Sequence, residues 1–402
     1  MKLNLGRDLY LKGRIGWKGL SKDEYLTNSD YKIINATALM DGYVDWNNCG
    51  FITKDRYEES PEIMLQEGDI LISKDGTLGK IGYVKGLTTP CTVASGIFVL
   101  RNSIPEKLNF DYLYHVLKSN IFKDFIQRNK SLGSTILHLY QRDLENFELE
   151  LPSMEHQRSI SGILNAIEDK IANNNKINAE LESLAKTIYD YWFLQFEFPN
   201  EEGKPYKSLG GKMVWNEELK REIPEGWAVK KLNSIANLYQ PEILPSNLMK
   251  EDGKYFVYGA NGIVGRYNKF NHEQPEIAIC CRGASCGNYL MTLPRSWITG
   301  NSMVVTPKDS SVTKEYLYHS LRYIDIKRYV TGSAQPQITR SNLDGIKVVI
   351  PPLKSLELFS NKAEKIRNEL IKNINENNEL SSLRDFLLPM LLNGQISFKE
   401  GN

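Results

Sequence analysis

The chain has 402 residues, which is too long for one ordinary hydrophobic core and predicts two domains. With 41% hydrophobic and 25% charged residues, the composition is typical of a soluble globular protein and argues against disorder or low complexity. The formal net charge of +1 leaves a nucleic-acid partner open, because such binding depends on where the basic residues lie rather than on their sum.

The start of the chain and its cysteines argue against several further classes of protein. The segment MKLNLGRDLYLKGR has charges too closely spaced for a signal peptide, and no apolar run approaches the roughly 18 residues that span a bilayer. We therefore expect a cytoplasmic protein. The five cysteines show no Cys-x-x-Cys spacing and no neighbouring histidine, so buried thiols are favoured over a disulfide framework or a zinc site. No metal site is predicted.

Residues 1–151 are predicted to form a first globular domain rich in β-strands. Within it, the stretch GDILISKDGTLGKIGYV, residues 68–84, has an apolar strand, a glycine-containing turn and a second strand. The domain closes with GSTILHLYQRDLENFELELP, residues 133–152.

A long helix is predicted over residues 152–198, because apolar residues recur every three or four positions and form one seam. The seam consists of Ile160, Leu164, Ile167, Ile171, Leu181, Leu184 and Ile188. Two asparagines, Asn174 and Asn178, interrupt it. In a seam between two helices such asparagines fix the register at some cost in stability, because a slipped pairing leaves their amides unsatisfied.

Residues 199–222 are rich in glycine, lysine and glutamate and have no periodicity, so they are predicted to be a linker. A second globular domain is predicted over residues 223–351. It contains PEIAICCRGASCGNYLM, residues 275–291, which resembles the strand–turn–strand stretch of the first domain. It closes with GSAQPQITRSNLDGIKVVIP, residues 332–351, which resembles the closing stretch of the first domain.

A second long helix is predicted over residues 352–392, followed by a tail over residues 393–402. Its apolar seam consists of Phe359, Ala363, Ile366, Leu370, Leu380, Leu383 and Leu387. Asn373 and Asn377 interrupt this seam at the same places as the asparagines of the first helix.

The two copies of this pattern form a tandem repeat. From Gly133 and Gly332 onward they stay 199 positions apart without a gap as far as Phe193 and Leu392. We expect an α+β fold of two pseudo-symmetric, β-rich globular domains separated by two long antiparallel helices that form a coiled-coil-like spacer. Helices of about 30 residues measure roughly 45 to 50 Å, longer than a domain of this size needs. The alternative is that each helix packs on its own domain, with its asparagines in solvent.

Few arrangements of catalytic residues are present. The stretch GTLGKIG, residues 76–82, lacks the spacing and the hydroxyl residue of a P-loop. One set, Glu242, Asp252 and Lys254, fits the spacing of a magnesium-dependent nuclease, in which two carboxylates hold the metal and a lysine assists the attack of water. Asp252-Gly253 is typical of a turn, however, whereas such a site needs a strand.

Five segments carry a resemblance to a known family. They are LPSMEHQRSISGILNAIEDKI, YDYWFLQFEFP, PEGWAVKKL, YGANGIVG and LRDFLLPMLLNGQI. Together they resemble the specificity (S) subunit of type I restriction-modification systems, in the order that the family has, over nearly the whole chain. Two details depart from the family: the second copy lacks an equivalent of Glu155 and Gln157, and Met390 stands where the family often has lysine.

The resemblance implies a non-catalytic subunit of a host-defence system, with two target-recognition domains that each read one half of a bipartite DNA target. It also implies two methyltransferase (M) subunits, which use S-adenosylmethionine for DNA methylation, and restriction (R) subunits, which use ATP and Mg. This chain itself is expected to bind no cofactor. Half-sites read one helical turn apart, roughly 34 Å, predict a non-specific gap of roughly five to eight base pairs.

Given a DNA target, basic and polar side chains in the loops of the first domain are candidate contacts. A glycine-punctuated loop gathers basic residues around a tryptophan, and the strand–turn–strand stretch and the closing stretch add others. The candidates are Lys12, Arg14, Trp17, Lys18, Lys74, Thr77, Lys80, Ser134 and Thr135. The alternative for the first loop is that it is solvated and that its tryptophan is packed.

In the second domain the closing stretch is the most specific candidate. Gln335 and Gln337 are suited to bidentate pairing with adenine, and Arg340 to guanine or phosphate. The whole set is Asn261, Arg266, Arg282, Ser285, Ser333, Gln335, Gln337 and Arg340. The two copies keep the flanking residues and vary those between, as expected of one scaffold that reads two sequences. Exposed polar residues at strand ends are the alternative.

The ends of the two helices are predicted either to dock an M subunit or to cap the core of the first domain. These residues are Tyr191, Trp192 and Phe193, with Met390, Leu391 and Leu392 as their counterparts. The asparagines are predicted to set the helix register. The alternative functions are a stand-alone magnesium nuclease and a structural coiled-coil adaptor without a DNA role, and salt-sensitive duplex binding separates the DNA reader from the adaptor.

Overall fold

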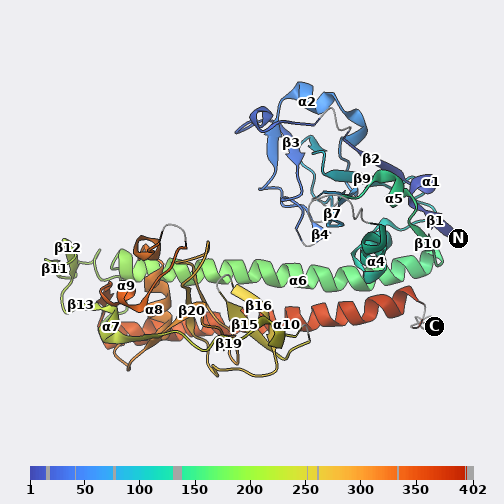
Figure 1. Cartoon of the computed structure of the whole chain (residues 1–402). Coiled ribbons are helices and arrows are strands. Elements are labelled where there is room, and N and C mark those ends of the chain that lie inside the picture. The colour runs from blue at the N-terminus through green and yellow to red at the C-terminus, as the bar shows by residue number, and fades with distance from the viewer. Residues whose placement is uncertain are drawn as a thin grey trace. The chain divides into compact units, whose positions relative to one another are not determined.

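The computed structural model describes residues 1–14, 19–40, 42–75, 78–129, 138–250, 252–259, 262–332, 335–393 and 395 (Figure 1). The chain divides into two compact units. Unit 1 consists of Met1–Ala172 and Asn377–Asn402, and unit 2 consists of Asn173–Glu376. Both boundaries fall inside long helices. In the described part of the chain, no helix is long and apolar enough to cross a membrane.

Unit 1 is built on a five-stranded sheet, a three-stranded sheet and one further strand pair. The larger sheet has the order β2 (Tyr10–Gly13), β9 (Ile97–Arg101), β6 (Ile70–Ser73), β7 (Ile81–Tyr83) and β4 (Gly42–Tyr43). The smaller sheet has the order β5 (Gly50–Ile52), β3 (Tyr31–Ile34) and β8 (Cys91–Val93), and β1 (Lys2–Asn4) pairs with β10 (Glu148–Glu150). The helices are α1 (Leu5–Asp8), α2 (Lys54–Glu58), α3 (Phe110–Lys118), α4 (Asn120–Asn129) and α5 (Gln141–Glu145). The inner strands β6 and β9 are rich in Ile, Val, Leu and Phe, which suits strands buried on both faces.

Unit 2 repeats this arrangement. Its larger sheet has the order β14 (Ala236–Tyr239), β20 (Ser302–Pro307), β17 (Ile277–Cys280) and β18 (Tyr289–Met291). Its smaller sheet has the order β16 (Gly262–Tyr267), β15 (Tyr255–Gly259) and β19 (Trp297–Ile298), and β13 (Ala228–Lys231) pairs with β21 (Lys347–Ile350). The short helices are α7 (Leu232–Ile235), α8 (Lys314–Leu321) and α9 (Arg340–Asp344).

The predicted duplication is confirmed by equivalent strand pairings and hydrogen bonds. In both units the second strand of the larger sheet, β9 or β20, is antiparallel to both of its neighbours. The smaller sheet of each unit contains one parallel pair, β3 with β8 and β15 with β19. The N–H of Leu5 donates to the carbonyl of Phe147 at 3.1 Å, and the N–H of Leu232 donates to the carbonyl of Ile346 at 2.7 Å. Phe147 and Ile346 are themselves 199 positions apart.

The predicted linker is folded. Within it, β11 (Met213–Asn216) forms an antiparallel hairpin with β12 (Arg221–Pro224). Val214 and Leu219 pack against the core of unit 2, which gives the hairpin a fixed place despite its lack of sequence periodicity. Trp215 on the same hairpin is exposed.

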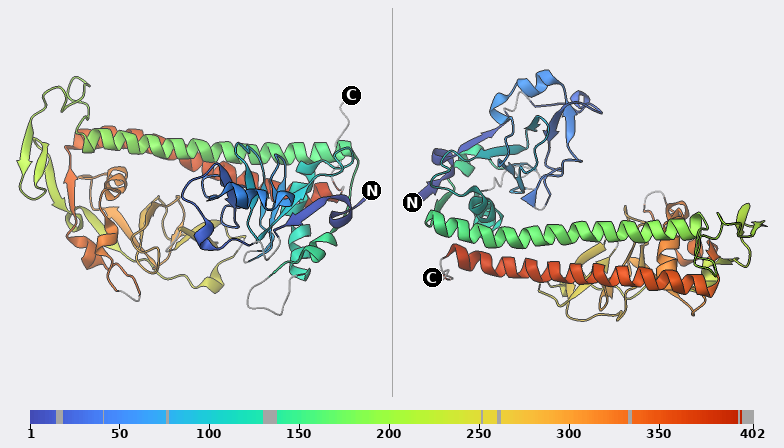
Figure 2. Two further views of the ribbon diagram at one scale, coloured as in Figure 1. Left: turned by 90° about the horizontal axis from the view of Figure 1, so that it is seen from above. Right: turned by 180° about the vertical axis from the view of Figure 1, so that it is seen from behind.

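The two long helices are α6 (Met154–Tyr189), which continues into a π-helical turn over Asp190–Leu194, and α10 (Leu353–Leu392). Figure 2 shows them side by side, α6 in green and α10 in red. In unit 1, Glu168 of α6 faces Arg384 of α10 at 3.8 Å. In unit 2 the helices are also antiparallel, because contacts that come later on α6 come earlier on α10.

Three of the four asparagines lie where the helices meet in unit 2. Asn174 is buried and its amide donates to Glu376 at 2.7 Å, and the amide of Asn373 donates to Oδ1 of Asn178 at 2.9 Å. Asn377, in unit 1, is half-buried. Their effect on register stays a prediction.

The prediction that two leucines lie in the buried seam is wrong. Leu184 and Leu383 are 48% and 45% exposed, and Ala185 is buried instead of Leu184. The period of 3.6 residues per turn rotates a straight helix away from a strict repeat of threes and fours, which moves the buried stripe by one residue near the helix ends.

Candidate nucleic-acid interface

In unit 2 the structure brings together two loops that are far apart in the sequence. Arg282, just after β17, forms an isolated antiparallel bridge with Gln337, just before α9. The N–H of Gly283 donates to the carbonyl of Pro336 at 3.1 Å, and the N–H of Ile338 donates to that of Cys281 at 3.0 Å. The side chains of Arg282, Gln335 and Gln337 are exposed. Three of the candidate residues therefore lie on adjoining loops with their polar groups in solvent.

Two further loops join this surface. The N–H of Cys281 donates to the carbonyl of Asn301 at 3.0 Å, and Oγ of Ser302 donates to the carbonyl of Gly259, at the end of β15, at 3.1 Å. Gln240, just after β14, donates its amide to the carbonyl of Gly300 at 3.4 Å. We call the surface formed by Arg282, Asn301, Gln335 and Gln337 the loop face of unit 2.

Unit 1 repeats the same backbone frame. Asp75, just after β6, forms an isolated antiparallel bridge with His138, and Gln337 is 199 positions after His138. The N–H of Leu139 donates to the carbonyl of Lys74 at 2.9 Å, and the N–H of Lys74 donates to that of Gly96 at 2.8 Å. These bonds correspond to those of Ile338 and Cys281 in unit 2.

The side chains on this frame differ between the units. In unit 1, Nδ1 of His138 contacts Oδ1 of Asp75, and the imidazole lies 4.7 Å from the ring of Tyr140. Arg142 lies over that ring at 5.0 Å. We call Lys74, Asp75, His138 and Tyr140 the loop face of unit 1. It carries a carboxylate and an imidazole where unit 2 carries a guanidinium and an amide.

Asp75 and His138 were not among the predicted contacts, although the sequence contained a signal for them. His138 lies opposite Gln337 at the offset of 199, and Asp75 lies opposite Arg282 when the two strand–turn–strand stretches are aligned. The pairing itself joins residues 63 positions apart, so no local pattern reveals it.

Arg14 was predicted to contact DNA, and the structure corrects this. Only 2% of the residue is exposed, and its guanidinium donates to the carbonyl of Val93 at 3.0 Å and to Thr92 at 3.4 Å. Burial lowers the pKa of the guanidinium below its ordinary value. Arg14 follows β2 as Gln240 follows β14, but Arg14 ties the larger sheet to β8 of the smaller sheet, whereas Gln240 ties it to the loop at Gly300.

The other predicted lysines of unit 1 differ in how accessible they are. Lys12 is exposed on β2, with its ammonium 5.9 Å from the ring of Tyr10. Lys74 is half-buried over the ring of Phe98 at 4.9 Å, and burial lowers its pKa. Lys80 donates to the carbonyl of Leu39 at 3.2 Å. Of these three lysines, all in the described part of the chain, only Lys12 is exposed.

The remaining candidates of unit 2 lie in different places. Arg266 is half-buried, lies over the ring of Phe256 at 4.1 Å and donates to the carbonyl of Gly253 at 3.5 Å. Ser285 is half-buried, and Arg340 is exposed on α9, 3.9 Å from Asp344. Seven predicted contacts lie outside the described residues: Trp17, Lys18, Thr77, Ser134, Thr135, Asn261 and Ser333.

The predicted partner-binding residues at the helix ends are mostly buried. Trp192 and Phe193 belong to the hydrophobic core of unit 2, where Phe193 packs edge-on against Phe359 at 5.1 Å. They do not cap the core of the first domain, because the end of α6 lies in unit 2, and their docking role stays a prediction. Leu391 is buried in the core of unit 1, and Leu392 is half-buried against it. Tyr191 remains 40% exposed, and Met390 is half-buried.

The nuclease alternative has no support in the geometry. Glu242, Asp252 and Lys254 are all exposed, and the last two precede β15 in a turn and a bend rather than lying on a strand. Among the described residues, no group of three or more His, Cys, Asp or Glu side chains is placed to hold a metal ion.

The chain is similar to a known protein family. The model of the type I restriction modification DNA specificity domain matches residues 16–183 and 224–380. The chain belongs to this family. Both matched segments include one loop face and part of one long helix, so the internal duplication is a duplication of the family domain.

Curated specificity subunits and a solved structure extend the match over most of the chain. The chain is 28% identical to the type I restriction enzyme MjaIX specificity subunit of Methanocaldococcus jannaschii, over 87% of this chain and 82% of that protein. It is 23% identical to the type I restriction enzyme HindI specificity subunit of Haemophilus influenzae, over 83% of this chain and 87% of that protein. The fold is similar to that in the crystal structure of a type I restriction-modification S subunit from M. genitalium, with a TM-score of 0.60 and 19% identity. The match covers 100% of this chain and 96% of that chain.

The chain is therefore a DNA specificity subunit, a recognition component and not an enzyme. It acts within a restriction-modification complex on DNA. The adaptor and nuclease alternatives are not supported.

Proposed function

We propose that each unit reads one half of a bipartite DNA target through its loop face, and that the long helices set the spacing of the halves. The observation that carries this assignment is the repeated backbone frame with different side chains, Asp75 and His138 in unit 1 and Arg282 and Gln337 in unit 2. A shared frame gives both faces the same approach to a groove. The different donors and acceptors give them different base preferences.

The exposed groups on these faces suit base edges. Arg282 has the planar donor fork that pairs with O6 and N7 of guanine, and an amide such as that of Gln337 pairs with N6 and N7 of adenine. The carboxylate of Asp75 accepts from N4 of cytosine. His138 contacts this carboxylate, which holds it at the surface of the loop.

For partners, we propose two M subunits, one on each long helix. Leu184 on α6 and Leu383 on α10 are exposed at positions 199 apart, which gives the helices equivalent apolar surfaces. Tyr191 extends the first surface, and Phe386, 62% exposed, extends the second. Equivalent surfaces fit two copies of one partner. S-adenosylmethionine then belongs to the M subunits, ATP and Mg belong to the R subunits, and the complex acts in the cytoplasm.

The assignment is tested by co-expressing the chain with the M subunit encoded beside it and mapping methylated adenines by single-molecule sequencing of host DNA. We expect a split motif with one modified adenine in each half, on opposite strands. Arg282→Ala and Gln337→Ala should each relax one or two positions in a single half, with a loss of about 1–3 kcal/mol of discrimination. The other half should stay unchanged.

The matched control is Arg221→Ala, which removes an exposed arginine of unit 2 from the β11–β12 hairpin. It should leave both halves of the motif intact. An unchanged motif in the Arg282→Ala/Gln337→Ala double variant, with normal methylation, would show that unit 2 reads DNA elsewhere.

A further inference from the structure

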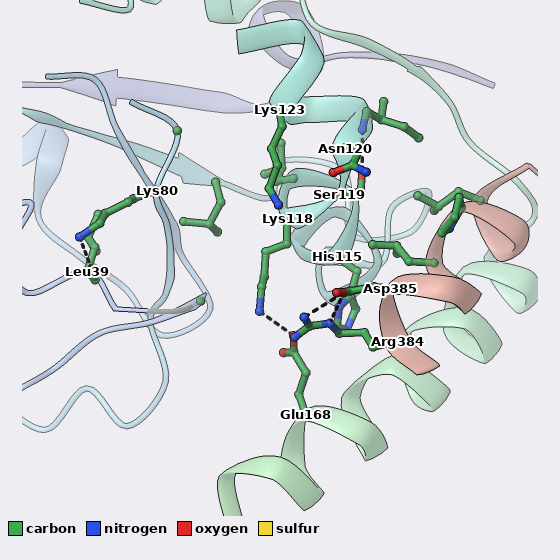
Figure 3. A pocket seen from close by; sticks show the side chains of 18 of the residues that line it. Leu39, Lys80, His115, Lys118, Ser119, Asn120, Lys123, Glu168, Arg384 and Asp385 are labelled. Carbon is green, nitrogen blue, oxygen red and sulfur yellow. Dashed lines mark hydrogen bonds and ion pairs between the residues drawn. The ribbon is translucent and has the colours of Figure 1, made fainter. Parts of the chain in front are cut away.

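Each unit has a hollow at an equivalent place. In unit 1 it has a volume of about 780 Å³ and is lined by the turn Gly79–Ile81, the region around the end of α3 and the start of α4, and parts of α6 and α10 (Figure 3). In unit 2 it has a volume of about 740 Å³ and is lined by the turn Gly287–Tyr289 and the segment from Tyr318 to Lys327. We call these the hairpin pockets.

The two pockets are built from corresponding residues. Tyr-Leu-Tyr-His occurs twice, at residues 112–115 in α3 and 316–319 in α8, 204 positions apart. The same offset places Phe122 opposite Ile326, and both side chains are buried in the cores of their units. It also places Lys123 opposite Lys327, and both lysines line their pockets.

The turn in each pocket packs closely on the segment that bears the lysine. Gly79 and Gly287 have left-handed φ angles of 73° and 91°. A Cβ at Gly79 lies 3.3 Å from Ile126, three residues after Lys123, and one at Gly287 lies 3.1 Å from Cγ of Lys327. The N–H of Gly79 donates to the carbonyl of Ser73 and the N–H of Gly287 to that of Cys280, both at 2.9 Å, so each turn closes on the strand end that leads to the loop face of its own unit.

Most charged groups around the pockets already have partners. In unit 1, Lys118 pairs with Glu168 at 2.6 Å, Arg384 lies between Glu168 and Asp385, and Lys80 donates to a carbonyl. In unit 2, Arg328 pairs with Asp325 at 2.9 Å. Lys123 and Lys327 are exposed, and within the described part of the chain neither ammonium group has an ion-pair partner. Figure 3 shows Lys123 reaching from α4 toward the other side chains of its pocket.

We infer that Lys123 and Lys327 each bind a backbone phosphate of the DNA beside the half-site that the adjoining loop face reads. This rests on the proposed function. Phosphates carry no sequence information, so residues that bind them stay the same in two domains that read different bases. The lysines follow this rule, because both units have lysine at this position, whereas the residues on the loop faces differ. An ammonium group suits a phosphate oxygen as a point charge.

The experiment measures the salt dependence of binding of the chain, in complex with its M subunit, to a duplex that carries the mapped motif. Lys123→Ala and Lys327→Ala should each lower the slope of log K against log salt by about 0.9, and the double variant by about twice that. Lys123→Arg and Lys327→Arg should keep most of the slope. The methylation motif should be unchanged, because only phosphate contacts are lost.

The control is Lys207→Ala, an exposed lysine in the segment before β11, which should leave the slope unchanged. On a duplex without the motif, the Lys123 and Lys327 variants should lower the salt slope by the same amount. The result can therefore be interpreted even if the proposed base contacts are wrong. An unchanged slope in the double variant overturns the inference. An unchanged slope together with weaker binding of the M subunit also overturns it, because the pockets then hold carboxylates of that partner. A changed methylation motif overturns it as well, because the lysines then contact bases.

Discussion

The two units share a backbone frame but differ in the side chains that occupy it. Equivalent positions of the two long helices carry Glu168 on α6 in unit 1 and Arg367 on α10 in unit 2, 199 positions apart. Glu168 pairs with Lys118, whereas Arg367 pairs with Glu315, at 2.6 and 2.7 Å. The acidic and the basic residue are exchanged between the short helix, α3 or α8, and the long helix, α6 or α10. An ion pair joins the two helices in both units. Backbone geometry is thus the conserved part of the repeat, and side-chain chemistry is the variable part.

The largest difference expected between the units lies at the helix ends. Phe193 is buried among Trp227, Tyr316 and Phe359 in unit 2, while its counterpart Leu392 is half-buried in unit 1. Phe193→Ala should lower the free energy of unfolding by about 3–5 kcal/mol, and Leu392→Ala by clearly less, because less buried surface is lost. Denaturant unfolding measures both. If Phe193→Ala is as stable as the wild type but no longer binds the M subunit, the docking role predicted from the sequence holds.

A second contrast concerns the residues that follow β2 and β14. Arg14→Ala should destabilise the chain by about 3 kcal/mol, because it leaves the buried acceptors around Val93 and Thr92 without their donor. Gln240 is exposed, so Gln240→Ala should cost about 1 kcal/mol or less. Thermal unfolding and methylation mapping are measured together. A stable Arg14→Ala variant with an altered motif would return Arg14 to the set of DNA contacts.

The buried histidines of the repeated Tyr-Leu-Tyr-His sequence should respond differently to pH. Burial, with the nearby Arg367 and Arg322 acting in the same direction, lowers the pKa of His319 to about 3. Burial also lowers the pKa of His115, but Glu168 and a hydrogen bond with Asn165 oppose the shift.

Because the unfolded chain binds a proton at His319 near pH 6.5 and the folded chain does not, stability falls as the pH drops from about 6.5 toward about 3. For His319 the loss between pH 7 and pH 5 is about 2 kcal/mol. Denaturant midpoints measured against pH should show a slope that His319→Phe flattens more than His115→Phe does. Equal flattening would mean that the charge at the position of Glu168 and Arg367 has no influence on the histidine beside it.

The sequence predicted the features that depend on periodicity and repetition. The two long helices, the duplication and the strand–turn–strand stretches follow from spacing that a single sequence contains. Burial was harder to predict. Arg14 looked like a phosphate contact because it lies in a basic loop, yet the fold encloses it. Trp192 and Phe193 looked like a docking surface, because the sequence does not show that α6 ends in the other unit's core.

The site was predicted in outline. Arg282 and Gln337 were chosen from separate loops, and their contact across 55 positions depends on tertiary structure that no local pattern encodes. Asp75 and His138 were missed for the same reason. The repeated Tyr-Leu-Tyr-His sequence was a readable signal, since four identical residues at one offset locate the pockets in both copies.

The strand pairs β1–β10 and β13–β21 also have an evolutionary consequence. β1 and β10 are the first and last strands of unit 1, and β13 and β21 are the first and last strands of unit 2 after the β11–β12 hairpin, so the chain enters and leaves each recognition domain at neighbouring points. The unit is thus an interchangeable cassette with two adjacent ends, and another cassette with the same ends fits without altering the helices. On the proposed reading of one half-site by each unit, replacing residues 5–147 or 232–346 as blocks should change one half of the target and keep the other. A few cassettes, combined in pairs, then generate a number of specificities that grows as the square of their number.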